Sequence, residues 1–211
     1  MQSYDRLVFV DYDGTVTMQD TVVKSLNLFM DPEEAMSIAN ELHSGEITLS
    51  RAVHRCFDGQ DQRLIPKMLS NIKNVRIRPG FEEFLERMEE LEIPVVLLSA
   101  GFEPLIMYKI GHLQNMFLDM YYGRIEVEDG CIKIVGKYDD GVELINKQQV
   151  MSQYQSDMKI AIGDGLTDIG MATDADLTFA RGQLMDMMDE RGLEYIHWDD
   201  FFDIIKVIEN L

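Results

Sequence analysis

Cysteine is scarce in this chain. Its 211 residues include only Cys56 and Cys131, which lie far apart in sequence and near no other candidate metal ligand. Disulfide-framed folds and cysteine-based zinc sites need more cysteines at closer spacings. Two isolated cysteines indicate reduced packing residues in a cytoplasmic protein.

Long hydrophobic runs are missing as well. No apolar stretch approaches the roughly 18 residues that cross a bilayer, and the first residues show no signal-peptide pattern. We therefore expect a cytoplasmic protein that does not contact membranes.

Positive charge is the third shortage. Lysine and arginine together number 19 against 38 aspartates and glutamates, which gives a formal net charge of −19 at pH 7. Nucleic acids are bound through clusters of lysine and arginine, so this composition argues against nucleic acid as a partner. An anionic small molecule would require a metal and a few local cations. The histidines share no ligand spacing, which argues against a zinc site: they are His43, His54, His112 and His197.

The chain does contain a regular alternation of strand and helix signals. Hydrophobic residues make up 46% of it, enough for one full core or a core with a smaller attachment. Apolar runs predict strands over residues 7–10, 94–98, 159–162, 177–180 and 195–198. Helical periodicity predicts helices over residues 81–91, 103–112, 147–154, 166–173, 183–191 and 201–209. This alternation predicts an α/β fold with a parallel sheet and right-handed crossovers.

Two segments depart from the alternation. Residues 124–135 alternate polar and apolar on both sides of Asp129-Gly130, which predicts a β-hairpin. Residues 18–77 contain no strand signal. Their predicted helices cover residues 21–27, 33–43, 49–57 and 61–71. We therefore predict a Rossmann-like core of residues 1–17 and 78–211, with a helical cap of residues 18–77 inserted after the first strand.

The first predicted strand ends in two aspartates. Asp11 and Asp13 follow the apolar residues 7–10 and enter a turn at Gly14. Open α/β sheets bind their ligands beyond the carboxyl ends of the strands. Two neighbouring carboxylates repel each other, and burying them is unfavourable unless a cation lies between them. The pair therefore predicts a Mg²⁺ site with carboxylate chemistry beside it.

Two further signals follow predicted strands. Ser99-Ala100-Gly101 comes directly after one strand, and residues 163–168, Gly-Asp-Gly-Leu-Thr-Asp, come after another. Each alone is compatible with an ordinary turn or helix cap. Several such signals in order, each ending a strand predicted to be parallel, are hard to explain by turns alone.

A lysine completes the set, and two are candidates. Lys147 opens a predicted helix whose apolar positions lead into the next strand, whereas Lys137 lies in the loop-like sequence Lys-Tyr-Asp-Asp-Gly. A packed helix start holds a side chain in place, whereas a loop leaves it solvated. We therefore favour Lys147 and keep Lys137 as the alternative.

In this order, the four motifs resemble those of the haloacid dehalogenase-like phosphohydrolase superfamily, and the resemblance covers the whole chain. It implies Mg²⁺-dependent hydrolysis of a small phosphomonoester through an aspartyl-phosphate. Asp11 would be the nucleophile, and Asp13 would protonate the leaving alkoxide and then activate water. The second aspartate is absent from the transport ATPases and dehalogenases of the superfamily, which argues against both activities.

The same resemblance implies further roles. Mg²⁺ would be held by the carboxylate of Asp11, the backbone carbonyl of Asp13 and the carboxylate of Asp164. Asp168 would orient the lysine or waters around the metal. The groups that would hold the phosphate are a hydroxyl, two backbone N–H groups at a helix N-terminus and an ammonium: Ser99, Ala100, Gly101 and Lys147.

The helical insertion between the first and second motifs is similar to the C1-type cap of the phosphoserine-phosphatase-like branch, subfamily IB. Phosphoserine phosphatases carry, a few residues beyond the first motif, a glutamate that receives the substrate amine, and this chain has Asp20 there. A fuller similarity is to the methylthiopentenyl-phosphate phosphatases of methionine salvage. It spans residues 11–20, 47–57, 80–84 and 179–181. It implies a small keto-enol phosphomonoester as substrate, with Asp20 among its binding residues.

Some alternatives stay open at this point. Phosphoserine or another small metabolite phosphate is the alternative substrate. A catalytically silent phosphate-binding module on the same fold is the alternative of another class, although such a module has no need of Asp13. The apolar residues Leu49, Val53 and Phe57 could receive a substrate tail or form the core of the cap. The chain is expected to act as a monomer or homodimer.

Overall fold

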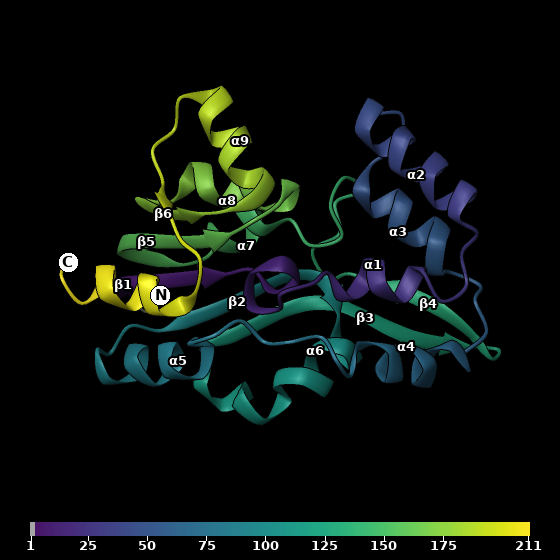
Figure 1. The fold of residues 1–211 in the computed structure, drawn as a ribbon, viewed down its shortest axis with the longest axis horizontal. Coiled ribbons are helices and arrows are strands. Elements are labelled where there is room, and N and C mark those ends of the chain that lie inside the picture. The colour runs from purple at the N-terminus through teal and green to yellow at the C-terminus, as the bar shows by residue number, and fades with distance from the viewer. Residues whose placement is uncertain (1–2) are drawn as a thin grey trace.

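The strands form one sheet at the centre of the molecule. The computed structural model describes residues 3–211. Over that part of the chain seven strands pair in the order β4-β3-β2-β1-β5-β6-β7, all in parallel except the antiparallel β3–β4 pair (Figure 1). Their bounds are β1 (Ser3–Val10), β2 (Val95–Phe102), β3 (Asp119–Glu128), β4 (Cys131–Val135), β5 (Gln155–Gly163), β6 (Leu177–Ala180) and β7 (Ile196–His197). The predicted α/β fold is confirmed.

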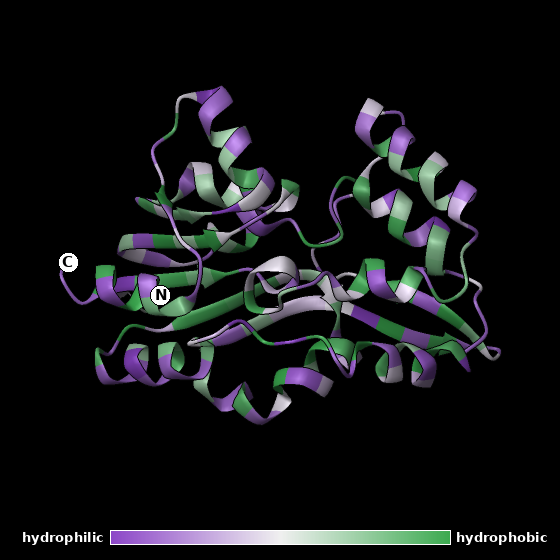
Figure 2. Cartoon of the chain, viewed as in Figure 1, coloured by the Kyte–Doolittle hydropathy of each residue, from purple (hydrophilic) through white to green (hydrophobic). Residues whose placement is uncertain are grey.

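Helices cover both faces of this sheet. Their bounds are α1 (Thr21–Leu26), α2 (Pro32–Ser44), α3 (Leu49–Phe57), α4 (Leu64–Ile72), α5 (Phe81–Glu90), α6 (Glu103–Ile110), α7 (Lys147–Met151), α8 (Ile169–Asp174), α9 (Gly182–Arg191) and α10 (Phe201–Ile208). Along β1, Val8 and Val10 pack in one cluster with α5 and α10, whereas Leu7 and Phe9 pack in another with α7 and α8. Successive side chains of a strand point to opposite faces, which explains this division. Because both faces of the central strands are covered by helices, these strands are hydrophobic along most of their length, as Figure 2 shows.

The differences from the predicted elements lie mainly at their ends. The predicted hairpin is confirmed, with Asp129 and Gly130 both at positive φ (49° and 81°), as a two-residue hairpin turn favours. Its first strand begins earlier than expected, at Asp119, and first pairs in parallel with β2. The predicted helix over 147–154 is too long, because α7 ends at Met151 and a turn at residues 152–153 leads into β5. Within residues 3–211, no helix combines the length and apolar character needed to cross a bilayer.

The segment between β1 and α5 is helical, and its two connections run side by side. Thr17 and Ile77 form an antiparallel bridge. The Met18 N–H donates to the Arg76 carbonyl at 3.0 Å. The segment that leaves β1 and the segment that leads into α5 are therefore hydrogen-bonded to each other.

The helices of this segment share their core with the β3–β4 hairpin. Val53 and Phe57 of α3 are buried in one cluster with Ile132 and Ile134 of β4, and with residues of α4 and α6. Leu49 packs against the same cluster. These apolar residues therefore pack in a core, which is the second of the two alternatives: a contact with a substrate tail or a core of the helical segment.

The outer edge of β4 is closed by the chain that follows α3. The Gly59 N–H donates to the Ile132 carbonyl at 2.8 Å, and the Ile132 N–H donates to the Gln60 carbonyl at 2.7 Å. The Asp58 carboxylate accepts from the Ile134 N–H at 2.7 Å. These backbone groups, which an edge strand leaves free, are bonded here.

His54 links α3 to the loop between β4 and α7. Its Nδ1 lies 2.8 Å from Asp58 Oδ2, and its Nε2 lies 3.0 Å from Asp139 Oδ2. The Ser50 hydroxyl also donates to Asp139. Partial burial lowers the pKa of His54, but the hydrogen bonds to Asp139 and Asp58 outweigh it and raise the pKa above its ordinary value.

We expect His54→Gln to lower the free energy of unfolding more at weakly acidic pH than at weakly alkaline pH. Because the folded-state pKa is raised, protonated His54 stabilises the fold fully below the unfolded pKa of 6.5, and this contribution is lost as the pH rises through the folded pKa. Urea unfolding at about pH 6 and about pH 9 measures the difference in free energy between variant and wild type. His112→Gln, at an exposed histidine, is the control. A difference that grows with pH would contradict this role.

Candidate active site

Three of the motifs meet at the carboxyl ends of adjacent strands. Asp11 follows β1, Ser99 lies near the end of β2, and Asp164 follows β5, and these strands are neighbours in the sheet. The Asp11 N–H donates to the Ile162 carbonyl of β5 at 3.0 Å. The central strands therefore bring the first, second and fourth motifs to one place.

Lys147 supplies the positive charge at this place. Its side chain is fully buried, and Nζ lies 2.5 Å from Asp11 Oδ1 and 2.5 Å from Asp168 Oδ1. Lys137 instead has its Nζ 5.1 Å from the ring centroid of Tyr138, on the loop after β4. Burial lowers the pKa of Lys147, but Asp11 and Asp168 together raise it above its ordinary value. The ammonium group therefore stays charged.

Asp168 holds Lys147 and the fourth motif together. Its Oδ1 accepts from Lys147, and its Oδ2 accepts from the backbone N–H groups of Asp164 and Gly165, at 2.9 Å each. A Cβ on Gly163 would lie 2.6 Å from the same carboxylate, so only glycine leaves room for it. Both oxygens of Asp168 are engaged in positioning their neighbours.

Buried carboxylates outnumber cations here, which fits a divalent metal. Oxygens of Asp11, Asp164 and Asp168 lie within 4.8 Å of one another. Since Asp168 is already engaged, Asp11 and Asp164 are the available carboxylate ligands. Burial, followed by the charge of Asp168, raises the pKa of Asp11 well above its ordinary value and that of Asp164 to about 6. A cation would relieve this crowding, and Mg²⁺ prefers oxygen ligands of this kind.

Gly14 allows the first turn to approach Asp164 closely. Its φ is +84°, and a Cβ at this position would lie 2.2 Å from Asp164 Oδ2. The neighbouring Thr15 hydroxyl donates to Asp164 Oδ1 at 2.9 Å. A left-handed conformation with no room for a side chain requires glycine. Thr15 is not among the predicted site residues, although it lies within the first motif.

Asp13 is held by the start of α1. Its Oδ1 accepts from the backbone N–H and from the hydroxyl of Thr21, both at 2.7 Å. Burial and then the charge of Asp20 raise the pKa of Asp13 to about 7, against the opposing effect of the Thr21 hydrogen bonds. A carboxyl group that titrates near neutral pH can both donate and accept a proton. The sequence marks Thr21 only as a helix start, so its contact with Asp13 is not predicted.

The second motif faces Asp13 from β2. The Gly101 N–H donates to Ser99 Oγ at 2.9 Å, and a Cβ on Gly101 would lie 2.6 Å from Asp13 Oδ2. The expected position of Ser99, Ala100 and Gly101 at a helix N-terminus is wrong. The strand continues to Phe102 with a register shift, so α6 begins only at Glu103.

Asp20 caps α1 at the rim of the site. Its Oδ1 accepts from the Val23 N–H at 2.8 Å, as an N-cap does, and the residue is exposed. Its charge contributes to the raised pKa of Asp13. Asp20 therefore lies near Asp13 and has a structural use of its own.

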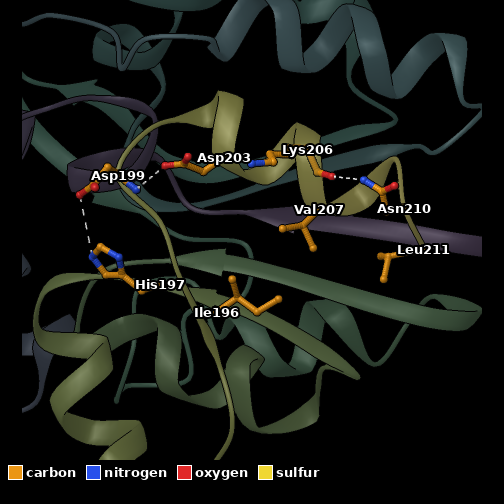
Figure 3. A pocket seen from close by; sticks show the side chains of 8 residues that line it. All are labelled: Ile196, His197, Asp199, Asp203, Lys206, Val207, Asn210 and Leu211. Atoms are coloured by element: carbon orange, nitrogen blue, oxygen red, sulfur yellow. Dashed lines mark hydrogen bonds and ion pairs between the residues drawn. The ribbon is translucent and has the colours of Figure 1, made fainter.

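A separate hollow of about 630 Å³ lies beside β7 and α10 (Figure 3). Figure 3 shows His197 pointing toward Asp199 on one side of the hollow. On the other side lie Lys206 of α10 and Asn210, which follows the end of this helix. The residues that line it are Ile196, His197, Asp199, Asp203, Lys206, Val207, Asn210 and Leu211. None of them belongs to the four motifs, so this hollow is distinct from the acidic site.

Comparison with known proteins agrees with this geometry. Among curated proteins, the chain is 31% identical over 201 residues to the 2-hydroxy-3-keto-5-methylthiopentenyl-1-phosphate phosphatase of Microcystis aeruginosa (strain NIES-843 / IAM M-2473), covering 94% of this chain and 95% of that protein. It is 27% identical over 210 residues to the protein of the same name from Bacillus pumilus (strain SAFR-032), covering 94% of this chain and 88% of that protein.

Solved structures show the same fold. A substrate-bound phosphoserine phosphatase complex superposes with a TM-score of 0.75 at 18% identity, covering 98% of this chain and 99% of that chain. A phosphoserine phosphatase with a phospho-aspartyl intermediate analogue superposes with a TM-score of 0.72 at 21% identity, covering 97% of this chain and 99% of that chain. Residues 8–173 match the family description "haloacid dehalogenase-like hydrolase". The chain therefore belongs to the haloacid dehalogenase-like hydrolase family.

Proposed function

We propose that this chain is a Mg²⁺-dependent phosphatase that hydrolyses a small phosphomonoester through an aspartyl-phosphate on Asp11. The observation that carries the proposal is the buried Asp11 carboxylate, paired with Lys147 and adjacent to Asp164. The family and the names of the relatives support the same reaction class.

The residues present fit one Mg²⁺ ion. The carboxylates of Asp11 and Asp164 and the backbone carbonyl of Asp13 would hold it. When bound, the ion supplies positive charge that lets a carboxylate approach a phosphate dianion. A dication also offsets the excess of buried carboxylates that Lys147 alone leaves unbalanced.

The chain's own groups divide the reaction into two steps. The Asp11 carboxylate attacks phosphorus and forms an acyl phosphate as the bond to the alcohol oxygen breaks. Asp13, with a pKa of about 7, donates its proton to that oxygen. In the second step it takes a proton from the water that attacks phosphorus, which breaks the bond to Asp11, releases inorganic phosphate and restores the free carboxylate. Lys147 neutralises charge on the phosphoryl group. The second motif supplies the remaining phosphate contacts: Ser99, Ala100 and Gly101.

For the substrate, we propose a keto-enol phosphomonoester of the kind named for the relatives, methylthiopentenyl phosphate. Residues 18–77 would act as a cap that reads its organic part over a core of residues 1–17 and 78–211. Asp20, exposed beside Asp13, suits a hydroxyl-bearing or cationic group better than a second anion such as the carboxylate of phosphoserine. Met18, two residues before Asp20 and 38% exposed, offers apolar surface to the thioether of this substrate.

The test compares kcat/KM for methylthiopentenyl phosphate and phosphoserine with Mg²⁺ present. We expect a preference for the keto-enol compound of at least about tenfold, since one unfavourable charge contact costs on the order of 1 kcal/mol or more. Hydrolysis of p-nitrophenyl phosphate with and without Mg²⁺ is the control that reports on the catalytic groups alone. A preference for phosphoserine would overturn the substrate only. No Mg²⁺-dependent hydrolysis of any ester would overturn the phosphatase and favour a silent phosphate-binding module.

A further inference from the structure

Two arginines lie over the ring of Trp198, the single tryptophan of the chain. Trp198 is buried after β7, with 1% exposure. The Cζ atom of Arg78 lies 5.1 Å from its ring centroid, and that of Arg181 lies 5.3 Å away. Contacts of this length between a guanidinium and an indole are attractive, more so when water is excluded. We refer to these three residues as the Arg78–Trp198–Arg181 cluster.

Arg78 joins the cluster to the first motif. It is 5% exposed, and its Nε donates to the Thr15 carbonyl at 2.7 Å. Its Nη2 donates to the Gly14 carbonyl, and its Nη1 donates to the Asp199 carbonyl at 3.2 Å. The planar guanidinium therefore holds the two carbonyls that directly follow Asp13 in one fixed arrangement.

Arg181 joins the cluster to the fourth motif. Its backbone N–H donates to the Gly163 carbonyl at 3.3 Å. The next residue, Gly182, has φ +55° and passes so close to the Asp164 carbonyl that a Cβ would lie 2.9 Å from it. The Leu184 N–H then donates to that carbonyl at 3.0 Å. These backbone contacts hold the Asp164 turn against residues 181–184.

We propose that the Arg78–Trp198–Arg181 cluster is a positioning element that keeps the Asp11–Asp13 turn and the Asp164 turn at the spacing that Mg²⁺ requires. This inference rests on the proposed metal site. The two turns carry carboxylates that repel each other, so contacts that hold the turns together are needed. Mg²⁺ accepts only a narrow range of ligand distances, which makes its affinity sensitive to small shifts of either turn.

The test measures Mg²⁺ affinity of the full-length protein by calorimetry without substrate. We expect Trp198→Leu to weaken Mg²⁺ binding about tenfold, and Trp198→Phe to weaken it less, because phenylalanine keeps a ring face. Phe84→Leu is the matched control. Phe84 is buried in the same core and packs on Phe201 at a centroid distance of 5.1 Å, against 5.3 Å for Trp198. It lies over neither arginine, so its loss should leave Mg²⁺ affinity unchanged.

Arg78→Lys provides a second arm that leaves the ring of Trp198 in place. It keeps the positive charge but loses the planar fork, so we expect a 10- to 100-fold loss of Mg²⁺ affinity and a fall in kcat with little change in KM. Equal Mg²⁺ affinity in Trp198→Leu, Arg78→Lys and Phe84→Leu would overturn the positioning role. A wild-type protein that binds no Mg²⁺ would overturn the cofactor proposal and this inference with it. Failure to hydrolyse phosphate esters, with the expected order of affinities intact, would overturn only the proposed reaction.

Discussion

Replacing Asp11 with asparagine is expected to abolish phosphomonoester hydrolysis, with a loss of at least about 10⁴-fold in kcat. The neutral amide cannot attack phosphorus, and it removes one charged ligand from the proposed metal site. Steady-state hydrolysis of p-nitrophenyl phosphate with saturating Mg²⁺ measures the loss. Trapping of a beryllofluoride adduct on wild-type Asp11, absent from the variant, would identify the same carboxylate by its chemistry.

The fold should survive this change. Burial and the charge of Asp168 raise the pKa of Asp11, so removing its charge relieves repulsion, while Lys147 keeps its bond to Asp168. The midpoint of thermal unfolding of Asp11→Asn should therefore equal or exceed that of the wild type. Asp5→Asn, at an exposed position on the same strand, controls for the substitution itself and should retain full activity. Turnover near wild type in Asp11→Asn would remove the nucleophile assignment.

Asp13→Asn is expected to lose about 10²- to 10⁴-fold in rate, the usual contribution of general acid–base catalysis. Asparagine can still accept the hydrogen bonds from Thr21, so the turn keeps its support. The loss should shrink along a series of aryl and alkyl phosphates as the leaving group becomes more acidic, because a good leaving group needs no proton. A loss that is constant along the series would indicate a structural role only.

Asp20→Asn supplies the matched control for Asp13. Asp20 carries a charge that raises the pKa of Asp13, so its neutralisation should lower that pKa from about 7. The protonated acid would then be lost at lower pH, and the alkaline limb of the rate profile for a poor leaving group should move to lower pH. Turnover at the new optimum should stay within a few fold of the wild type, since the asparagine can still cap α1.

The first and fourth motifs could be found from the sequence because their signals are local. Asp11 directly follows a short apolar run, and Asp13 and Asp164 lie within three residues of one, so the run alone indicates which end of the strand they occupy. Lys147 could be favoured for its place at a helix start, yet its contact with Asp168 depends on tertiary packing.

Contacts between distant segments leave no such local mark. The predicted hairpin omitted residues 119–123, because their pairing partner is β2 rather than the hairpin itself. Arg78 and Trp198 lie in connecting segments far apart in the sequence, and neither has a spacing that indicates the other. The apolar face of α3 was evident from Val53 and Phe57, but helical periodicity cannot say that the hairpin covers it.

The closed outer edge of β4 bears on how this chain behaves beside other chains. A sheet grows, or aggregates, by adding a strand to free backbone groups at its edge. At one edge the residues after α3 already bond both backbone groups of Ile132 and the N–H of Ile134, and at the other edge β7 offers only Ile196–His197. Neither side provides a template for strand addition. Any homodimer of this chain should therefore form through side-chain surfaces, and partial release of the segment after α3 would be the step that exposes it to β-aggregation.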